Sequence, residues 1–423
     1  MNILIIGSGG REHALAYKLS QSTKLNNLFI TPGNAGTANL GKNVLIDTSD
    51  FAAVANFVID SYIDMIVVGP EAPLVDGIRD YFESKSELKH IKIIGPGKQG
   101  AMLEGSKNFA KEFMLRYNIP TASYFKLTKN NIKEGLKYLQ TINPPYVLKA
   151  DGLAAGKGVV ILNNINEAEN EIESMLNGKF GIAGKTVIIE QFLKGIEVSV
   201  FAITDGKNYC ILPEAKDYKR IGENDTGLNT GGMGAVSPVP FADKEFIEKV
   251  EERIIKPTIK GLIKENIDYK GFIFFGLMNV DGNPYVIEYN VRMGDPESEV
   301  VLPRIKTDFI ELFTACCNQK LNEIKIETDP RTVSTVMLVS GGYPEAYQKN
   351  KTIELPNNDK DCITFHAGTK FSGNNIVTNG GRVIAVSAFG NNIKDALKKS
   401  YQMAQKIKFE NVYFRKDIGF DLK

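Results

Sequence analysis

Four short apolar runs in the first hundred residues each end in a glycine-containing loop, with helical patterns between them. The runs span residues 2–6, 28–31, 65–68 and 92–94, and residues 11–21 have the spacing of a helix. Parallel strands buried on both faces have this continuous apolar character, and helices connect them. The pattern therefore predicts an α/β fold that begins with a parallel doubly wound sheet. Ligands of such sheets bind at the carboxyl ends of the strands, where these loops gather.

The length and the charge of the chain limit the classes of protein to which it can belong. At 423 residues it exceeds what one hydrophobic core supports, so several domains are expected. Its 51 Lys and Arg nearly balance 50 Asp and Glu, which disfavours nucleic acid as a partner. No stretch approaches the roughly 20 apolar residues of a membrane span, and the N-terminus lacks a signal-peptide pattern. The four cysteines form no CxxC motif, so we expect reduced thiols in a cytoplasmic protein with no membrane partner.

Beyond the first hundred residues the pattern changes to closely spaced strands. Strand patterns at 146–149 and 159–162 have only a glycine-rich loop between them. Two more, at 272–280 and 285–289, are joined by Asp-Gly-Asn, which predicts a tight hairpin. We further expect two longer segments, a polar glycine-rich loop at 216–234 and a helix at 243–264.

The loop after the first apolar run reads GSGGRE, residues 7–12. A dinucleotide fingerprint has a third glycine where Glu12 stands, so a nicotinamide-dependent dehydrogenase is a weak alternative. Free backbone N–H groups at the start of the following helix, together with Arg11, suit a phosphate instead. A tight turn without a ligand is the other interpretation left open.

A second glycine-rich loop reads KADGLAAGKGV, residues 149–159. It is not a Walker A loop, because three residues rather than four separate Gly152 from Gly156. In addition, Gly158 stands where a serine or threonine would bind magnesium. Glycines let backbone N–H groups approach anionic oxygens closely, and two lysines add charge. The stretch predicts a hairpin loop that folds over a triphosphate, with a purely structural glycine hairpin as the alternative.

A third polar cluster follows the last strand of the predicted hairpin. Glu288 and Asn290 are two residues apart on this strand and therefore point to the same face. Two oxygen ligands on one face suit Mg²⁺ that also binds nucleotide phosphates. Arg292 has the same parity and suits a substrate phosphate or carboxylate. A solvated strand face is the alternative, which the density of polar residues and glycines up to Glu297 disfavours.

These stretches together resemble the ATP-grasp superfamily, and within it the glycinamide ribonucleotide synthetase family. The resemblance runs from Met1 to about Gly419. It implies a Rossmann-like N-terminal domain at 1–104, a two-part ATP-grasp body at 105–328 with a lid at about 122–190, and a small β-rich domain at 329–423. The motifs that carry it occur in the family's order: GSGGREHAL, PGNAGT, VGPEAPLV, LEGSK, KADGLAAGKGV, NTGGMGA, GDPE, HAGT, TNGGRV and RKDIG.

The resemblance implies a reaction of de novo purine (IMP) biosynthesis. ATP, glycine and 5-phosphoribosylamine would give glycinamide ribonucleotide, ADP and phosphate through a glycyl phosphate. ATP and Mg²⁺ or Mn²⁺ would be the cofactors, and the family suggests a monomer.

The resemblance also implies the site residues. Lys107 and Lys149 would contact ATP phosphates, the 151–158 loop would close over them, and Glu288 and Asn290 would hold the metal. Lys107, Lys149, Asp217 and Arg292 would be the catalytic residues. The implied nucleotide site comprises Lys107, Lys149, Asp151, Gly152, Gly156, Lys157, Gly158, Glu190, Gln191, Phe192, Leu193 and Glu197. Within it, residues 190–193 would contact adenine through backbone groups, and Glu197 would bind the ribose hydroxyls. The implied phosphoribosylamine site comprises Gly9, Gly10, Arg11, Asn34, Glu71, Asp217, Arg292 and Asp295.

The sequence departs from the family pattern in two respects. Many ATP-grasp enzymes have an acidic metal ligand on the strand before the Glu-x-Asn pair, and the hairpin register places Gly276 near that position. Val291 and Met293 stand where the family commonly has Cys and Phe, which are packing changes.

Another ATP-grasp ligase or carboxylase acting on a related phosphoribosyl amine is the nearest alternative function. A nucleotide-gated scaffold without activity is a more distant one.

Overall fold

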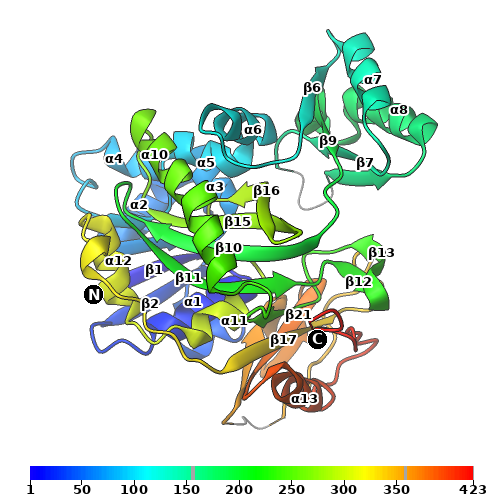
Figure 1. The fold of residues 1–423 in the computed structure, drawn as a ribbon. Coiled ribbons are helices and arrows are strands. Elements are labelled where there is room, and N and C mark those ends of the chain that lie inside the picture. Colours follow the sequence, from blue (N-terminus) through cyan, green and yellow to red (C-terminus); the bar gives the residue numbers. More distant parts are fainter. Residues whose placement is uncertain (154–157, 357–359, 423) are drawn as a thin grey trace.

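A computed structural model describes residues 1–153, 158–356 and 360–422 of the chain (Figure 1). Its N-terminal part is a five-stranded sheet in the order β3-β2-β1-β4-β5, and every strand pair in it is parallel. The predicted parallel doubly wound sheet is therefore confirmed. Its strands are β1 (Asn2–Gly7), β2 (Asn27–Pro32), β3 (Lys42–Asn43), β4 (Met65–Val68) and β5 (Lys92–Ile94), and its helices are α1 (Gly10–Leu19), α2 (Phe51–Asp60), α3 (Glu71–Asp76), α4 (Ile78–Glu83) and α5 (Lys98–Gly105).

The turn from β1 to α1 depends on glycine. Gly7 has φ +127°, and a Cβ there would lie 2.4 Å from the Glu12 side chain. Glu12 folds back so that its carboxylate accepts a hydrogen bond from the Gly9 N–H at 2.6 Å. Gly9 is the N-cap of α1 and brings no side chain of its own. The loop thus leaves the start of α1 open at the carboxyl edge of the sheet.

A second, four-stranded sheet stands apart from the rest of the molecule at the upper right of Figure 1. Its order is β6-β9-β7-β8, its strand pairs are antiparallel, and it has a hydrophobic core of its own with α7 and α8. The expected lid at about 122–190 corresponds to this unit, although its boundaries stay predictions. The elements are β6 (Tyr124–Thr128), α7 (Ile132–Thr141), β7 (Tyr146–Ala150), β8 (Val159–Leu162), α8 (Ile165–Ser174) and β9 (Thr186–Gln191).

The largest sheet has eight strands in the order β16-β15-β10-β11-β14-β17-β21-β18. Because β14 pairs with β17, strands from the middle and from the last ninety residues form one continuous antiparallel sheet. The predicted hairpin is present, with Asp281 and Gly282 at φ +49° and +78° between its strands. The strands are β10 (Ile196–Thr204), β11 (Tyr209–Asp217), β14 (Gly234–Ser237), β15 (Gly271–Val280), β16 (Asn283–Asn290), β17 (Thr332–Val339), β18 (Cys362–His366) and β21 (Arg382–Gly390).

Two segments differ from expectation. The segment 216–234 is only partly loop, because β11 extends to Asp217 and the short strands β12 (Arg220–Gly222) and β13 (Thr226–Asn229) pair. The expected helix at 243–264 is α9 (Lys244–Val250) and α10 (Lys256–Lys264) joined by a π-helical turn at 251–255. The other elements are α6 (Lys107–Arg116), α11 (Ser298–Arg304), α12 (Phe309–Cys317), β19 (Thr369–Ser372), β20 (Asn375–Thr378) and α13 (Ile393–Ala404).

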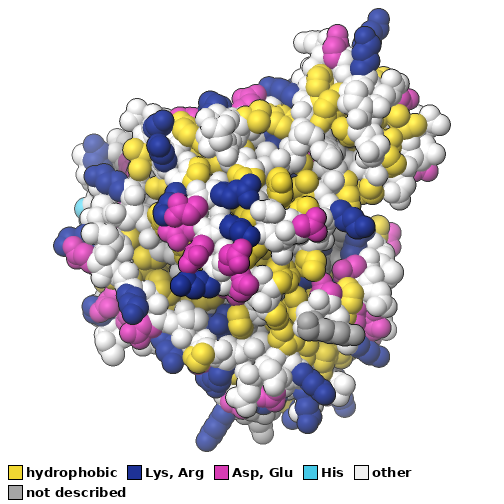
Figure 2. Space-filling model, in the orientation of Figure 1, with side chains coloured by type: hydrophobic (Ala, Val, Ile, Leu, Met, Phe, Trp, Pro, Cys, Tyr) yellow, Lys and Arg dark blue, Asp and Glu magenta, His cyan; other side chains and the backbone are white. Residues whose placement is uncertain are grey.

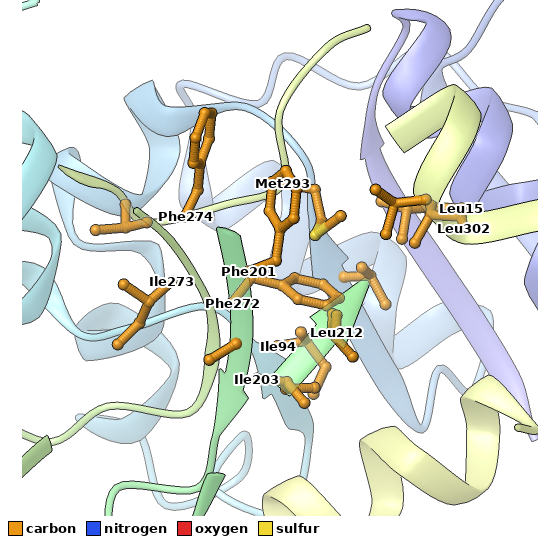
Figure 3. Close-up of a cluster of buried hydrophobic side chains, with 14 of the residues drawn as sticks. Leu15, Ile94, Phe201, Ile203, Leu212, Phe272, Ile273, Phe274, Met293 and Leu302 are labelled. Atoms are coloured by element: carbon orange, nitrogen blue, oxygen red, sulfur yellow. The ribbon is translucent and has the colours of Figure 1, made fainter. Parts of the chain in front are cut away.

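One hydrophobic core joins the N-terminal sheet to the eight-stranded sheet. In Figure 3, Leu15 of α1 and Ile94 of β5 lie in the same cluster as Phe201, Leu212 and Phe272 of the large sheet. Burial of such side chains contributes about 1.5–3 kcal/mol each, so this shared core holds the two sheets in a fixed relation. Loops from both sheets can therefore build one site.

The outer surface carries no dominant charge on the face in Figure 2, where Lys and Arg alternate with Asp and Glu. This agrees with the balanced composition. Within the described parts of the chain, no helix is long and apolar enough to cross a membrane.

Arg415 connects the C-terminal segment to the β12–β13 pair. Its side chain is fully buried, and its guanidinium donates to Asp417 at 2.8 Å, to Asp225 at 2.7 Å and to the Arg220 carbonyl at 3.1 Å. It also lies over the ring of Tyr218. Such a buried cation fixes the 218–231 segment against the C-terminus.

We expect Arg415→Met to lower the free energy of unfolding by about 3–5 kcal/mol, because it leaves two carboxylates without their cation. Arg331→Met is the matched control, since Arg331 also pairs with an aspartate two residues away, at 2.8 Å, but its own side chain is 45% exposed. It should cost less than about 1 kcal/mol. Urea denaturation of both variants measures this. Equal losses would contradict the role assigned to Arg415.

Candidate active site

The carboxyl edge of the N-terminal sheet faces the segment that follows β16. Arg11 donates to the Met293 carbonyl at 3.3 Å, and a Cβ on Gly9 would lie 3.1 Å from an Asp295 carboxylate oxygen. Arg292 reaches Glu71 at 3.5 Å. The structure thus brings together most of the residues implied for phosphoribosylamine: Gly9, Gly10, Arg11, Glu71, Arg292 and Asp295.

Asn34 lies at the same edge but is occupied by protein partners. Its amide nitrogen donates to the carbonyls of Ser8 and His366, at 2.9 and 2.8 Å, and its oxygen accepts from two N–H groups of its own loop. The side chain therefore organises three loops around the site. One of these loops comes from the C-terminal part of the chain.

Arg292 is oriented by a carboxylate that the motifs did not single out. Glu104 accepts from the Arg292 guanidinium at 2.7 Å and from the Val291 N–H at 2.8 Å. Burial raises the pKa of Glu104, although Arg292 opposes this. Burial alone would also raise the pKa of Glu71, but Arg292 lowers it. The arginine therefore stands between two acids, with its position set by Glu104.

Arg382 of β21 reaches the same place from the C-terminal strands. It pairs with the Asp295 carboxylate at 3.0 Å, donates to the Asp295 carbonyl at 2.7 Å and also donates to the Gly231 carbonyl. Glu299 lies beside it, fully buried, with no hydrogen-bond partner for either carboxylate oxygen among the described residues. Burial and the nearby Asp295 raise the pKa of Glu299, so we expect it to be uncharged.

The lysines implied for ATP lie at the junction of the lid with α6. Lys107 at the start of α6 donates to the Gly152 carbonyl at 3.2 Å. Asp151 accepts from Ser106 Oγ at 2.9 Å and from the Asn108 N–H at 3.1 Å, so the beginning of the glycine-rich loop is attached to α6. Gly158 also lies among the described residues, whereas Gly156 and Lys157 lie outside them. The loop expected to close over the phosphates therefore lies partly outside the described residues.

Lys149 and Glu190 form a buried ion pair on neighbouring strands of the lid sheet, at 3.0 Å. Lys149 also donates to the Ile287 carbonyl at 3.0 Å, which connects the lid to β16 next to Glu288. Gln191 bonds to Ser123, and Phe192 and Leu193 follow it in the segment between β9 and β10. Glu190 and Gln191 thus end β9, and Phe192 and Leu193 begin its connection to β10; the resemblance implies that this stretch borders adenine.

The two proposed metal ligands, Glu288 and Asn290, come from β16 as expected. Gly276 pairs with Glu288 in the hairpin, which confirms the register, and a Cβ on Gly276 would lie 2.8 Å from Glu288 Cγ. Burial alone would raise the pKa of Glu288, but Lys219, Lys149, Lys107 and Arg292 lower it, so we expect a carboxylate. In the part of the chain that the structure describes, no group of three or more His, Cys, Asp or Glu could hold a metal. An oxygen pair of this kind fits a hard cation completed by phosphate and water.

A cluster of carboxylates surrounds Lys219 on the large sheet. Lys219 pairs with Glu197 at 2.6 Å, and although burial opposes it, Glu197, Asp217 and Glu288 raise the pKa of this lysine well above its usual value. Burial and the neighbouring Glu197 raise the pKa of Asp217, against Lys219. Burial and Asp217 raise the pKa of Glu297 to about 8, and Ser199 Oγ donates to Glu297 at 3.1 Å. Glu197, implied for the ATP ribose, is thus engaged by a lysine.

Several site residues were not identified from the sequence. Glu104 belongs to LEGSK, Glu297 to GDPE and Arg382 to TNGGRV, so the motifs contained them without indicating a role. Lys219 gave only the signal of a charged residue near a motif. The roles of these residues depend on partners distant in the sequence, which spacing does not reveal.

Comparisons with known proteins agree with this geometry. The chain matches three family models, described as the N domain (residues 1–104), the ATP-grasp (A) domain (105–298) and the C domain (333–421) of phosphoribosylglycinamide synthetase. The chain belongs to the phosphoribosylglycinamide synthetase family. The expected architecture of a Rossmann-like domain, an ATP-grasp body and a C-terminal domain is thereby confirmed, while the boundaries at 104 and 328 stay predictions.

Full-length relatives of this family include phosphoribosylamine–glycine ligases. That of Vibrio vulnificus (strain YJ016) is 44% identical over 99% of this chain and 98% of its own length. That of Caldanaerobacter subterraneus subsp. tengcongensis is 43% identical over 99% of both. The crystal structure of the Thermotoga maritima phosphoribosylamine–glycine ligase superposes with a TM-score of 0.83 at 35% identity, over 99% of this chain and 100% of that one. Biotin carboxylase from Campylobacter jejuni has a TM-score of 0.74 at 16% identity, a likeness of fold alone.

The raised pKa of Glu297 predicts how the free energy of unfolding depends on pH. Between about pH 4.5 and 8 the folded chain keeps a proton that the unfolded chain releases, so this group's contribution to stability falls as pH rises. Glu297→Gln removes that dependence. The variant should gain stability relative to the natural chain between pH 5 and 8.5, by roughly 1.4 kcal/mol for each unit of pKa shift.

Chemical denaturation at both pH values measures this difference. The control is Glu245→Gln, at an exposed position, which should change the free energy by less than about 0.5 kcal/mol at either pH. An equal effect of Glu297→Gln at pH 5 and pH 8.5 would contradict the assignment.

Proposed function

We propose that this chain joins glycine to 5-phosphoribosylamine at the expense of ATP, giving glycinamide ribonucleotide, ADP and phosphate in purine (IMP) biosynthesis. The observation that carries the proposal is 44% identity, over 99% of the chain, to phosphoribosylamine–glycine ligases. The paired lysines beside the oxygen ligands of β16 support it. We propose that the chain acts in the cytoplasm, where its four cysteines would stay reduced, and that it is a monomer.

The chemistry requires activation of a carboxylate. A carboxylate does not react with an amine at neutral pH, because its oxygen is too poor a leaving group. Phosphorylation by ATP turns it into an acyl phosphate, from which phosphate leaves when the amine attacks. No covalent nucleophile of the protein is needed, so the task is alignment and charge neutralisation.

Lys107 and Lys149 supply charge on the phosphate side of the site. Lys107 donates to the Gly152 carbonyl at the start of the glycine-rich loop, and Lys149 donates to the Ile287 carbonyl of β16. Glu288 and Asn290 would hold Mg²⁺ or Mn²⁺, which when bound supplies further positive charge to the phosphates. The segment 190–193 offers backbone groups to adenine. The lid stands over this region and would exclude water from an acyl phosphate.

The amine substrate is assigned to the edge of the N-terminal sheet. Free N–H groups at the start of α1, with Arg11, suit the phosphate of phosphoribosylamine. Arg292 is held between Glu104 and Glu71, where it can bind an anionic oxygen. Asp217 and Glu297 lie near β16 as buried acids suited to an amino group. The proton that the amine loses on amide formation would pass to this pair.

The reaction is tested by ADP release from Mg-ATP with glycine, with and without phosphoribosylamine generated in situ. Release should require both substrates and should fall at least about 100-fold for Lys149→Ala, because a phosphate contact is lost. Lys129→Ala, at an exposed position of the lid, is the control and should keep full activity. Release with bicarbonate in place of glycine would indicate the alternative, an ATP-grasp carboxylase.

The metal ligands make a separate prediction. Glu288→Gln should raise the Mg²⁺ concentration for half-maximal activity about tenfold or more, since the hard cation loses its one carboxylate ligand. Titration of activity with Mg²⁺ and Mn²⁺ at saturating ATP measures it. Glu265→Gln, a surface carboxylate paired with Arg116, is the control. An unchanged requirement would exclude Glu288 as a ligand.

A further inference from the structure

Glu190 has two lysine partners rather than one. Its side chain is 3% exposed; one carboxylate oxygen lies 3.0 Å from Lys149 Nζ and the other lies 3.0 Å from Lys111 Nζ. Lys149 is assigned to the ATP phosphates, whereas Lys111 belongs to no ligand set described above. The second lysine therefore needs an explanation.

Lys111 is held in place on every side. It lies on α6 and is 2% exposed, and its ammonium group donates to Thr121 Oγ1 at 2.7 Å. Thr121 in turn donates to the Val286 carbonyl at 2.6 Å, and Lys111 also lies over the ring of Tyr124. Since its ammonium is enclosed by these groups and Glu190, Lys111 cannot reach a nucleotide.

Lys149 is placed differently. Besides Glu190 it contacts the Ile287 carbonyl, one residue before Glu288, and its side chain keeps 10% of its surface exposed. A rotation of its long side chain would bring the ammonium from Glu190 toward phosphates bound over Glu288 and Asn290. That rotation removes one cation from Glu190.

Because Glu190 is a buried carboxylate, moving Lys149 away from it is energetically unfavourable unless another cation stays beside it. Burial alone would raise the pKa of Glu190, but Lys149 and Lys111 lower it. Burial lowers the pKa of Lys111 to about 8, against Glu190. A buried carboxylate without a partner is strongly unfavourable. With Lys111 in place, Glu190 remains an ion pair after Lys149 has turned away.

We propose that Lys111 is a positioning residue that neutralises Glu190 and thereby frees Lys149 for the nucleotide phosphates. The proposal rests on the ATP site described above and extends it to a residue that touches no substrate. Lys111 acts through Glu190 alone. Removal of the Glu190 charge should therefore make Lys111 dispensable for nucleotide binding.

The test is a double-mutant cycle read out as MgATP affinity. Lys111→Met should weaken MgATP binding about tenfold, because Lys149 is then retained by Glu190. Lys111→Arg keeps the charge and should restore most of the affinity. The double variant Lys111→Met with Glu190→Gln should bind MgATP more tightly than Lys111→Met alone. The KM for glycine should not change in any of them.

Controls separate this role from a structural one. Lys126→Met removes a lysine of the lid sheet that forms only a surface ion pair with Glu112, at 3.5 Å, and should leave affinity unchanged. If Lys111→Met does not fold, Thr121→Val releases Lys111 while keeping its charge and should weaken binding by a smaller factor. Unchanged MgATP affinity in a folded Lys111 variant, or no recovery on adding Glu190→Gln, would overturn the proposal.

Direct titration with MgATP keeps this proposal separate from the proposed reaction. A chain that binds MgATP with the expected coupling but forms no product from glycine and phosphoribosylamine would contradict the reaction alone. A chain that forms product but shows no coupling would contradict only the role of Lys111.

Discussion

The pairing of β14 with β17 is the constraint on which the site depends. β14 has four residues, all buried, and begins with the last two residues of the NTGGMGA motif. Its first residue must be glycine, because a Cβ on Gly234 would lie 2.6 Å from the Thr335 carbonyl oxygen. Through this pairing the C-terminal strands become part of the large sheet, and Arg382 reaches Asp295. Three regions of the chain thus meet at one edge of the sheet: the loop after β1, the segment after β16 and the start of β21.

Ion pairs organise the charges that meet there. Lys149 with Glu190, Arg292 with Glu104, and Lys219 with Glu197 each neutralise a buried or half-buried group within the protein. Buried pairs of this kind add little net stability, since desolvation offsets much of the attraction. Their contribution is to hold cations in defined places before an anionic ligand arrives. Each phosphate or carboxylate of a substrate then competes with a protein carboxylate for its cation.

Local patterns predicted much of the fold. The runs at 65–68 and 92–94 became β4 and β5 with the same limits, because a buried parallel strand is apolar throughout. β11 was not predicted, since Pro213 and Lys216 interrupt its apolar pattern; it forms because β10 and β14 pair with it on both sides. The expected helix at 243–264 contains a π-helical turn before Pro257, which lacks the N–H of a regular helix.

The roles of some site residues could be predicted from the sequence, whereas the roles of others could not. Glu288 and Asn290 could be predicted, because both lie on one strand and the period of two places them on one face. The roles of Glu104 and Lys111 could not be predicted. Glu104 contacts Arg292, which is 188 residues away in the sequence, and Lys111 of α6 contacts Glu190 of β9. Contacts of this kind arise only when separate elements pack. Sequence motifs mark the region but not the partner.

The glycine at position 276 limits which residues of the hairpin can bind the metal. A side chain at this position would overlap Glu288 Cγ, so the hairpin can place a ligand at 288 or at 276 in this arrangement, but not at both without movement. One carboxylate and one amide oxygen offer a single negative charge, and Lys107, Lys149, Lys219 and Arg292 surround it. With a single protein carboxylate among its ligands, a divalent cation needs oxygens from nucleotide phosphates and water to complete its shell. We therefore expect the metal to enter the site as its complex with the nucleotide.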